Sequence, residues 1–401
     1  MEYDVVICGA GPAGLSTGIS TLFVNQDAKV LILETREVVG EEKCGEGISE
    51  SWFNRMSDYG LFLRKNLKEK CYENEMYGMV FYLPNKEKIT IRMKERQGWI
   101  INKDYFLKNL AEIFQSMGGE LRVGINSTEP IVNDGKVEGI EVNGEETVKA
   151  KYFVDATGVC QNIWRRVLGI TEPLDPKEIE VCFQYKVVDS RIDDHDLIHL
   201  YFGSEVAPGG YAWVFPKDQK RANVGLGCQA SKVKSAFPFM LKLWKDLNIH
   251  GTVISKKGGT VSSFDIPDTI VWSNLACVGA SARFTNPIHG GGTGPALYGG
   301  YILGKHIASD IKNNVPADKT MKNYQDEVKS TMKKGHKNLY RIKTMFQSFN
   351  DEEMNITLSS ITKEEWTRIM NLTKQDMVKI IARITKKDMK FGLKIPKYLK
   401  L

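Results

Sequence analysis

Two patterns of apolar and polar residues divide this chain of 401 residues. In the first 175 residues, and again around residues 270–310, short continuous apolar runs are followed by glycine-rich turns and helical patterns. Continuous runs such as Val5 to Cys8 are typical of parallel strands that are buried on both faces. Between residues 176 and 272 apolar and polar residues alternate, as in "GYAWVFPKD", which predicts short antiparallel strands. We therefore expect an α/β fold with an inserted antiparallel sheet.

The first apolar run is followed by the sequence "GAGPAG" and a helical pattern. Its glycines, Gly9, Gly11 and Gly14, have the spacing of a dinucleotide-binding turn, with Pro12 and Ala13 between them. The first glycine permits the tight turn, the second lets a pyrophosphate approach the backbone, and the third lets the helix pack on the strand. The N-terminus of the helix offers N–H groups and a partial positive charge to the phosphates.

A second apolar strand, "AKVLILETR", ends at Glu34, which lies 20 residues after Gly14. A carboxylate at this spacing can accept hydrogen bonds from the ribose hydroxyls of an adenosine, and it repels a 2′-phosphate. Two further strands, "YFVDATG" and "IVWSNLACVGA", also end in glycine-rich turns, and a helix is expected from about Pro295. Turns so far apart in the sequence suit a long cofactor that is contacted at several points, which favours FAD over NAD.

Composition excludes several other classes of protein. The net charge of +6 is mild, and no basic stripe interleaved with aromatic residues points to nucleic acid. The sequence contains no run of about 18 apolar residues, so a membrane-spanning helix is not expected. The N-terminus does not resemble a signal peptide. The seven cysteines include no CxxC pair, which argues against zinc and suits a reducing compartment. We therefore expect a cytoplasmic protein without a bound metal.

Five motifs occur in a specific order: "GAGPAG" with Glu34, "KCGEGIS", "DATG", "PGGYAWVFP" and "NPIHGGGTGPAL". In this combination the chain resembles the geranylgeranyl reductases, archaeal-type flavoproteins with a para-hydroxybenzoate-hydroxylase-like fold. The resemblance implies reduction of carbon–carbon double bonds in the isoprenoid chains of membrane lipids. It also implies FAD in an extended pose, reduced by an external electron donor, with a hydride from the flavin and a proton completing the saturation.

The resemblance assigns the FAD site to residues in six parts of the chain. They are Gly9, Gly11, Pro12, Ala13 and Gly14; Glu34 and Thr35; Cys44, Gly45 and Gly47; Lys103; Val123; and Ala280, Gly290, Gly291, Gly292 and Thr293. The expected domains are a discontinuous FAD-binding domain (1–100, 101–175 and 273–315), an antiparallel substrate domain (176–272) and a C-terminal helical region with a basic tail (316–401).

The substrate side is expected around Cys44 and the strand "YAWVFP". In the family the segment with the cysteine lies beside the flavin, so the thiol of Cys44 either donates the proton or packs there. Tyr211, Trp213 and Phe215 fall on one face of the strand, which suits a pocket for a long apolar chain or the core of the sheet. We take Cys44, Tyr211 and Trp213 as catalytic candidates. Tyr211, Trp213, Phe215 and His289 are the candidate substrate contacts.

One position departs from the family pattern. The family usually has Gly-Asp before the glycine-rich loop, with the aspartate holding the ribityl chain, whereas this chain has Gly279-Ala280. A lost hydrogen bond to a charged group costs about 1.5–3 kcal/mol, which weakens binding roughly 10–150-fold. Ser281 is the adjacent candidate for a replacement contact. Ala280 thus motivates one alternative, a prenyl-lipid-binding protein that has lost catalysis.

A second alternative is a flavin-dependent aromatic hydroxylase, because the same fold supports that chemistry. The expected partners are a prenylated lipid, a prenyl diphosphate or a quinone tail, together with the external electron donor. The C-terminus adds a third kind of partner, because a basic segment with interleaved apolar residues can bind an anionic membrane surface. The basic residues are Arg383, Lys386, Lys387, Lys390, Lys394, Lys397 and Lys400, with Asp388 as the single acid among them.

Overall fold

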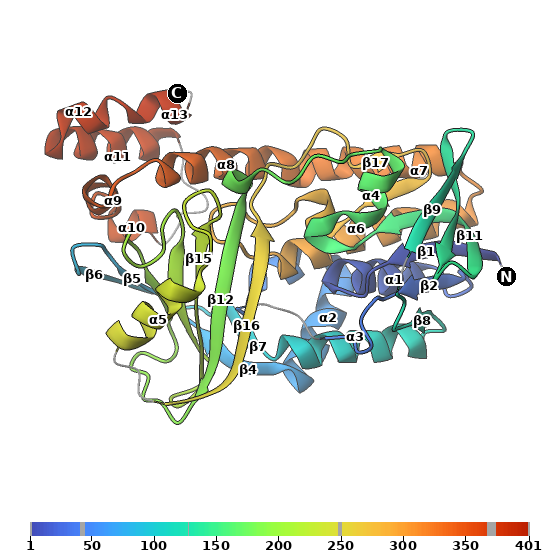
Figure 1. Ribbon diagram of the computed structural model, residues 1–401, viewed down its shortest axis with the longest axis horizontal. Coiled ribbons are helices and arrows are strands. Elements are labelled where there is room, and N and C mark those ends of the chain that lie inside the picture. The colour runs from blue at the N-terminus through green and yellow to red at the C-terminus, as the bar shows by residue number, and fades with distance from the viewer. Residues whose placement is uncertain (1, 41–44, 127, 248–250, 367–373, 400–401) are drawn as a thin grey trace.

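The computed structural model describes residues 2–40, 45–126, 128–247, 251–366 and 374–399. Two large sheets lie at opposite ends of the molecule and a long helical rod runs past both (Figure 1). The N-terminus lies at the outer end of the parallel sheet, and the C-terminal helices lie beside the antiparallel sheet (Figure 1).

The parallel sheet is built from the continuous apolar runs. Its main path, in spatial order, is β17 (Val271–Trp272), β18 (Leu275–Cys277), β11 (Glu146–Asp155), β1 (Glu2–Cys8), β2 (Val30–Leu33) and β8 (Glu120–Arg122). β9 (Thr128–Asn133) and β10 (Lys136–Val142) form a hairpin, and β10 pairs antiparallel with the first residues of the long strand β11. The strands β18, β11, β1, β2 and β8 are parallel, so their carboxyl ends meet at one edge, where a ligand is bound in this class of sheet.

Residues 270–277 were expected to form one strand and instead form a short hairpin. β17 pairs antiparallel with β18, with Val271 opposite Ala276. Ser273, between the strands, has a left-handed backbone (φ 50°), and Ser-Asn is a common turn sequence. Only β18 therefore leads directly into the glycine-rich turn at Gly279.

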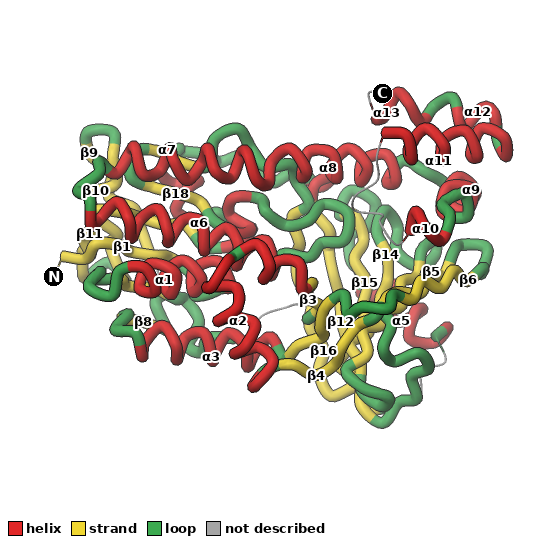
Figure 2. The backbone as a smooth tube through the Cα atoms, turned by 180° about the vertical axis from the view of Figure 1, so that it is seen from behind, coloured by secondary structure: helices red, strands yellow, loops and turns green. Residues whose placement is uncertain are grey.

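A layer of helices packs against the parallel sheet and lies in front of it in Figure 2. The principal ones are α1 (Pro12–Val24), α3 (Lys103–Ser116), α6 (Thr293–Lys312) and α7 (Ala317–Val328). Figure 2 shows α1, α6 and α7 lying side by side. Smaller elements connect these parts: η1 (Glu50–Arg55), α2 (Ser57–Lys70), η2 (Gly158–Cys160), α4 (Asn162–Val167), η3 (Pro176–Glu178) and η4 (Gly279–Ala282).

The antiparallel sheet contains the alternating segment predicted from the sequence, with two additional strands. Its order is β16 (Thr252–Ser262), β12 (Ile179–Val188), β15 (Ala222–Gln229), β14 (Tyr211–Pro216), β13 (Ile198–Tyr201), β5 (Gly78–Tyr82) and β6 (Lys88–Arg92). β5 pairs parallel with β13, so residues 78–92 join this sheet although we had expected range 1–100 to serve only the FAD-binding domain. A long-range strand pairing of this kind leaves no local signal in the sequence.

The two faces of the antiparallel sheet have different environments. Ala212 and Val214 of β14 lie in a buried apolar cluster that includes Met240 and Leu243 of α5 (Phe237–Asp246). The opposite face points toward a three-stranded sheet of β3 (Gly47–Ser49), β7 (Gly98–Ile101) and β4 (Tyr72–Met76), because Gly45 and Gly47 lie against Phe215. This face of the antiparallel sheet therefore borders the segment of Gly45 and Gly47.

The helical C-terminal region joins the two parts. α7, the π-helical turn η5 (Lys329–Lys333) and α8 (Lys334–Gln347) follow without a break and run past both sheets (Figure 1). Further helices pack at the end of the rod: α9 (Asp351–Leu358), α10 (Lys363–Trp366), α11 (Lys374–Lys387), α12 (Met389–Gly392) and α13 (Ile395–Leu399). No helix in the described part of the chain is long and apolar enough to cross a membrane.

Candidate functional site

The first turn has the close contacts that the glycine spacing predicts. Gly9 has φ 110°, and a Cβ there would lie 2.4 Å from the carbonyl oxygen of Ala156. A Cβ at Gly14 would lie 1.9 Å from the carbonyl oxygen of Gly9, so α1 packs directly on the turn. Gly11 is the N-cap of α1 and has no side chain to offer the first N–H groups, which leaves them to a ligand.

Glu34 lies at the end of β2 beside this turn and is 8% exposed. Its Oε2 accepts a hydrogen bond from the N–H of Ala10 at 2.7 Å, and its Oε1 accepts from the N–H of Arg36 at 2.9 Å. A carboxylate can accept about four hydrogen bonds, so capacity remains for ribose hydroxyls. The other predicted contacts here, Thr35 and Val123, are exposed at the ends of β2 and β8.

Two parallel helices point their N-termini toward this edge of the sheet, and α6 begins about 9 Å beyond α1, because its eighth residue lies against the second residue of α1. A Cβ at Gly300 would lie 2.6 Å from the carbonyl oxygen of Ala13, and a Cβ at Gly304 would lie 2.5 Å from that of Thr17. The contact positions advance together along both helices, so α1 and α6 run parallel and both N-termini point to the same edge. Each helix N-terminus contributes a partial positive charge at its own position along this edge, which favours an anionic or electron-rich part of a ligand at each.

The turn "DATG" has a structural role. Asp155 is fully buried, and its Oδ1 accepts hydrogen bonds from the N–H and hydroxyl of Thr157 and from the hydroxyl of Ser281. Its Oδ2 accepts from the N–H groups of Ile163 and Trp164 at the start of α4. Five internal donors occupy this carboxylate, so Asp155 fixes the turn and its side chain does not face a ligand.

Ser281 is 1% exposed and its hydroxyl is directed into the protein, toward Asp155 and the carbonyl oxygen of Gly158. It is therefore not placed to replace the aspartate that the family has at position 280. Ala280 itself is half-buried in η4, next to Gly279, where a Cβ would lie 2.6 Å from that of Ala13. The alanine thus lies close to α1.

The loop of residues 286–292 is folded by its own hydrogen bonds. The side-chain oxygen of Asn286 accepts from the N–H groups of Ile288 and His289, and Gly291 donates its N–H to Nδ1 of His289 at 3.1 Å. Gly290 has a left-handed backbone (φ 65°), and Gly292 is the N-cap of α6, before the buried Thr293. The backbone therefore presents its glycines without intervening side chains, as a broad flat ligand requires.

The side chain of His289 is exposed on the glycine-rich loop. Desolvation by neighbouring protein atoms lowers the pKa of His289 to about 4. The neutral imidazole agrees with the role of Nδ1 as an acceptor from Gly291. His289 is therefore unsuited to donate a proton at neutral pH.

Tyr211, Trp213 and Phe215 form a row of rings on the face of β14 opposite the apolar cluster. Neighbouring ring centroids are 5.9 Å and 6.0 Å apart. The indole of Trp213 lies over Gly225, where a Cβ would come within 2.6 Å of the ring, and its N–H donates to Oε1 of Gln184 at 3.1 Å. The rings thus form a continuous apolar surface outside the core cluster.

Both ends of this aromatic row contact predicted cofactor segments. The hydroxyl of Tyr211 donates to the carbonyl oxygen of His289 at 2.6 Å, which joins the sheet to the glycine-rich loop. At the other end, a Cβ at Gly45 would lie 2.8 Å from Phe215, and one at Gly47 would lie 3.5 Å away. Cys44, the leading candidate for proton donor, lies outside the described residues.

Sequence reasoning missed Glu46, which is 3% exposed between Gly45 and Gly47. Burial alone would raise the pKa of this carboxyl, but Lys217 and Lys186 outweigh that effect and hold the pKa below its usual value. Oε1 of Glu46 also accepts, at 3.4 Å, from the backbone N–H of Lys103, which is buried at the start of α3. A glutamate between two glycines was the available signal, since a charged residue in a tight turn requires partners.

These features fit FAD. The glycine cradles exclude side chains, the N-terminus of α1 suits a pyrophosphate, and Glu34 retains acceptor capacity for a ribose. Together with the antiparallel sheet above the glycine-rich loop, they define the class of flavin-dependent oxidoreductases in which a dinucleotide domain is combined with a substrate sheet.

Comparison with known proteins identifies the family within this class. A model of the geranylgeranyl reductase catalytic domain matches residues 178–261, and a model of FAD dependent oxidoreductases matches residues 4–165. A digeranylgeranylglycerophospholipid reductase of Methanocella arvoryzae is 30% identical over 95% of this chain and 96% of its own. The corresponding protein of Sulfolobus acidocaldarius is 29% identical over 77% of this chain and 70% of its own. The chain belongs to the geranylgeranyl reductase family.

Solved structures agree with this assignment. The crystal structure of a geranylgeranyl bacteriochlorophyll reductase-like protein from Thermoplasma acidophilum has a TM-score of 0.82 and 25% identity, covering 97% of this chain and 99% of that one. A flavin-dependent brominase has a TM-score of 0.70 at 17% identity, covering 97% and 100%, which shows the shared fold alone. The predicted fold, FAD as cofactor and the reductase activity on geranylgeranyl chains are thus confirmed. The individual site residues remain predictions.

Proposed function

We propose that this reductase saturates the geranylgeranyl chains of a digeranylgeranylglycerophospholipid, and that the row of Tyr211, Trp213 and Phe215 forms one wall of the chain-binding site. The observation that carries the proposal is the position of these rings. They lie opposite the core cluster and extend from His289 of the glycine-rich loop to Gly45. Relatives at 26–30% identity that act on this lipid support the choice of substrate.

When bound, FAD supplies the hydride that adds to one carbon of the double bond. The residues of the chain bind the apolar lipid tail, exclude water from it and provide the proton for the second carbon. His289 is neutral at physiological pH, so the proton must come from another group. We assign this role to Cys44, with the hydroxyl of Tyr211 as the second candidate, because Tyr211 lies at the junction of loop and sheet.

Mass spectrometry of the lipid product tests the proposal. The dithionite-reduced protein is incubated anaerobically with digeranylgeranylglycerophospholipid, and each saturated double bond adds 2 Da to the product. Heat-denatured protein with dithionite is the control for chemical reduction. Saturation of free geranylgeranyl diphosphate or a prenylated quinone, with the phospholipid left unchanged, would contradict the choice of substrate. Oxygen-dependent hydroxylation of an aromatic compound without any saturation would contradict the reductase activity.

We further propose that the basic C-terminus brings the protein to an anionic membrane surface, where the lipid substrate resides. Met389 and Leu393 lie four positions apart and are 70% and 65% exposed, beside Lys390 and Lys394. Ile395, one of the apolar residues interleaved with the basic ones, is instead 2% exposed in a local cluster. Cosedimentation with vesicles of anionic or neutral lipid tests the proposal, and equal binding to both would contradict it.

A further inference from the structure

Glu46 combines two unfavourable features that need compensation. Its backbone is left-handed (φ 72°), a conformation that is strained for a residue other than glycine. Its carboxylate is almost completely buried, and burial of an unpaired charge would cost considerably more. Strong interactions with neighbouring residues must therefore hold Glu46 in place.

The interactions come from the antiparallel sheet. Oε1 of Glu46 lies 3.0 Å from Nζ of Lys186 in β12, and Oε2 lies 2.7 Å from Nζ of Lys217 at the end of β14. Asn223 in β15 donates a hydrogen bond from Nδ2 to Oε2 of Glu46 at 2.7 Å. One carboxylate is thus held by three neighbouring strands of the substrate sheet.

Glu46 is held at the same time by the parallel-sheet side of the molecule. Its Oε1 accepts from the N–H of Lys103 at the start of α3, and its carbonyl oxygen accepts from the N–H of Ile101 in β7. Lys186, which binds Glu46, is also 3.6 Å from Asp104 in α3. These contacts therefore connect the antiparallel sheet with α3 and β7 through charged groups inside the protein.

The same network fixes the segment beside the aromatic row. Asn223, which binds Glu46, also donates to the carbonyl oxygen of Gly45 at 3.0 Å. Gly45 in turn lies so close to Phe215 that a Cβ would come within 2.8 Å of the ring. A small displacement of Glu46 would therefore change the distance between the Gly45–Gly47 backbone and the aromatic wall.

We propose that Glu46 is a positioning residue of the reductase: its carboxylate holds the Gly45–Gly47 segment against β14 and so sets the spacing between the aromatic wall and the cofactor site. Lys217 and Asn223 are its partners in this role. The inference uses the proposed lipid reaction for one of its readouts only.

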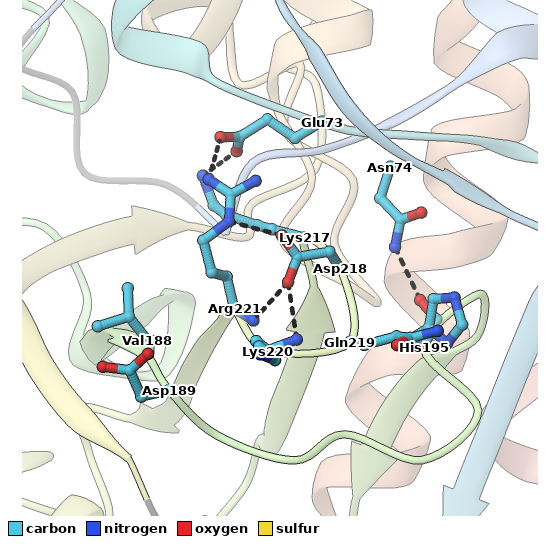
Figure 3. A pocket seen from close by; sticks show the side chains of 10 residues that line it. All are labelled: Glu73, Asn74, Val188, Asp189, His195, Lys217, Asp218, Gln219, Lys220 and Arg221. Atoms are coloured by element: carbon cyan, nitrogen blue, oxygen red, sulfur yellow. Dashed lines mark hydrogen bonds and ion pairs between the residues drawn. The ribbon is translucent and has the colours of Figure 1, made fainter.

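The outer side of Lys217 provides a matched control. Nζ of Lys217 also pairs with Glu73, which in turn accepts from Arg221, beside Asp218. These four side chains line an open hollow of about 560 Å³. Figure 3 shows how they lie around it. Glu73 therefore shares Lys217 with Glu46 but is separated from the Gly45–Gly47 segment by it.

The test compares Glu46→Gln, Glu46→Asp and Glu73→Gln with the wild-type protein. Hydrogen exchange, followed by mass spectrometry on the protein without substrate, reports the backbone directly. We expect at least tenfold faster exchange in peptides covering residues 45–49 and 98–103 for Glu46→Gln, and no change for Glu73→Gln. Because a misplacement of about 1 Å can cost on the order of 100-fold in rate, we expect kcat to fall about 100-fold in Glu46→Gln with KM little changed. Glu46→Asp, which keeps the charge, should recover part of that loss.

Equal exchange and equal kcat in Glu46→Gln and wild-type protein would overturn the proposal. An identical loss of kcat in Glu73→Gln would also overturn it, because the loss would then follow from removing either ion pair of Lys217. If Glu46→Gln does not fold, Asn223→Ala tests the proposal in its place, because it removes the hydrogen bonds to Glu46 and Gly45 without leaving a new charge. Normal exchange and kcat in a folded Asn223→Ala protein would count against the proposal. If wild-type protein leaves the lipid unchanged, the proposed substrate fails, and the exchange data still decide the role of Glu46.

Discussion

Replacing Gly300 by alanine tests whether the contact between α1 and α6 builds the cofactor site. A Cβ at this position would lie 2.6 Å from the carbonyl oxygen of Ala13, 2.8 Å from Cβ of Ser16 and 2.9 Å from the nitrogen of Thr17. Two of these atoms belong to the backbone and cannot rotate away, so the helices must separate by several tenths of an ångström. Overpacking of this kind costs typically about 1–3 kcal/mol.

Gly335 in α8 is the matched control, because an added Cβ there meets no atom within 4 Å. Alanine inside a helix is favoured over glycine by roughly 0.5–1 kcal/mol, so Gly335→Ala should stabilise the protein. The same chemical change should therefore alter the free energy of unfolding in opposite directions at the two positions. Gly300→Ala should also weaken FAD binding, because it shifts α6, which follows the glycine-rich loop, relative to α1, which follows the phosphate-binding turn.

Denaturant unfolding of the FAD-free protein measures the first effect, and fluorescence titration with FAD measures the second. Because the gain in helix propensity is common to both positions and cancels, we expect the unfolding free energies of the two variants to differ by about 1–3 kcal/mol, the cost of overpacking at Gly300. Equal stability of the two variants would refute the packing argument. A destabilised Gly300→Ala protein with wild-type FAD affinity would refute the link between helix contact and cofactor site.

Four further predictions concern individual side chains. Glu34→Ala should weaken FAD binding by about 1–3 kcal/mol, because it removes a charged acceptor; unchanged affinity in a titration would contradict the ribose contact. Ala280→Asp should slow the loss of FAD during dialysis, whereas equal or faster loss would show that the site is built around alanine. Cys44→Ala should keep FAD but slow lipid saturation about 10²–10⁴-fold, and a wild-type rate would transfer the role of proton donor to Tyr211, tested by Tyr211→Phe. Because the pKa of Glu46 lies below its ordinary 4.5, its stabilising effect is complete above that pH and is lost as the pH falls through the lowered pKa; the difference in Tm between wild type and Glu46→Gln should therefore shrink under acid, and a constant difference would contradict the ion pairs.

The features that sequence predicted best are those with a local signal. The turn at Gly9–Gly14 and the acid at Glu34 follow from a fixed spacing between a strand and a helix, and the structure places both at the carboxyl edge of the sheet. The faces of β14 were also predicted correctly, because alternation along one strand separates Ala212 and Val214 from the three rings.

Features that depend on distant partners were not predictable in this way. The pairing of β5 with β13 joins segments about 120 residues apart, and nothing within residues 78–82 indicates which sheet they enter. The structural role of Asp155 could not be predicted for the same reason, since one of its donors, Ser281, is 126 positions away. Glu46 acquires its importance only through Lys186 and Lys217, which follow it by 140 and 171 positions in the chain.

The contact between α1 and α6 also has a consequence for biosynthesis. Ser16 donates its hydroxyl proton to the carbonyl oxygen of Leu297, 281 positions later. During translation the phosphate-binding turn is therefore made long before the helix that completes it, and the whole antiparallel sheet is synthesised between the two. FAD can stabilise only a state that already binds it, so the cofactor cannot assist the early nascent chain. A ribosome-bound fragment that ends before residue 312 should accordingly emerge colourless, and the yellow of the flavin should appear only after α6 has left the exit tunnel.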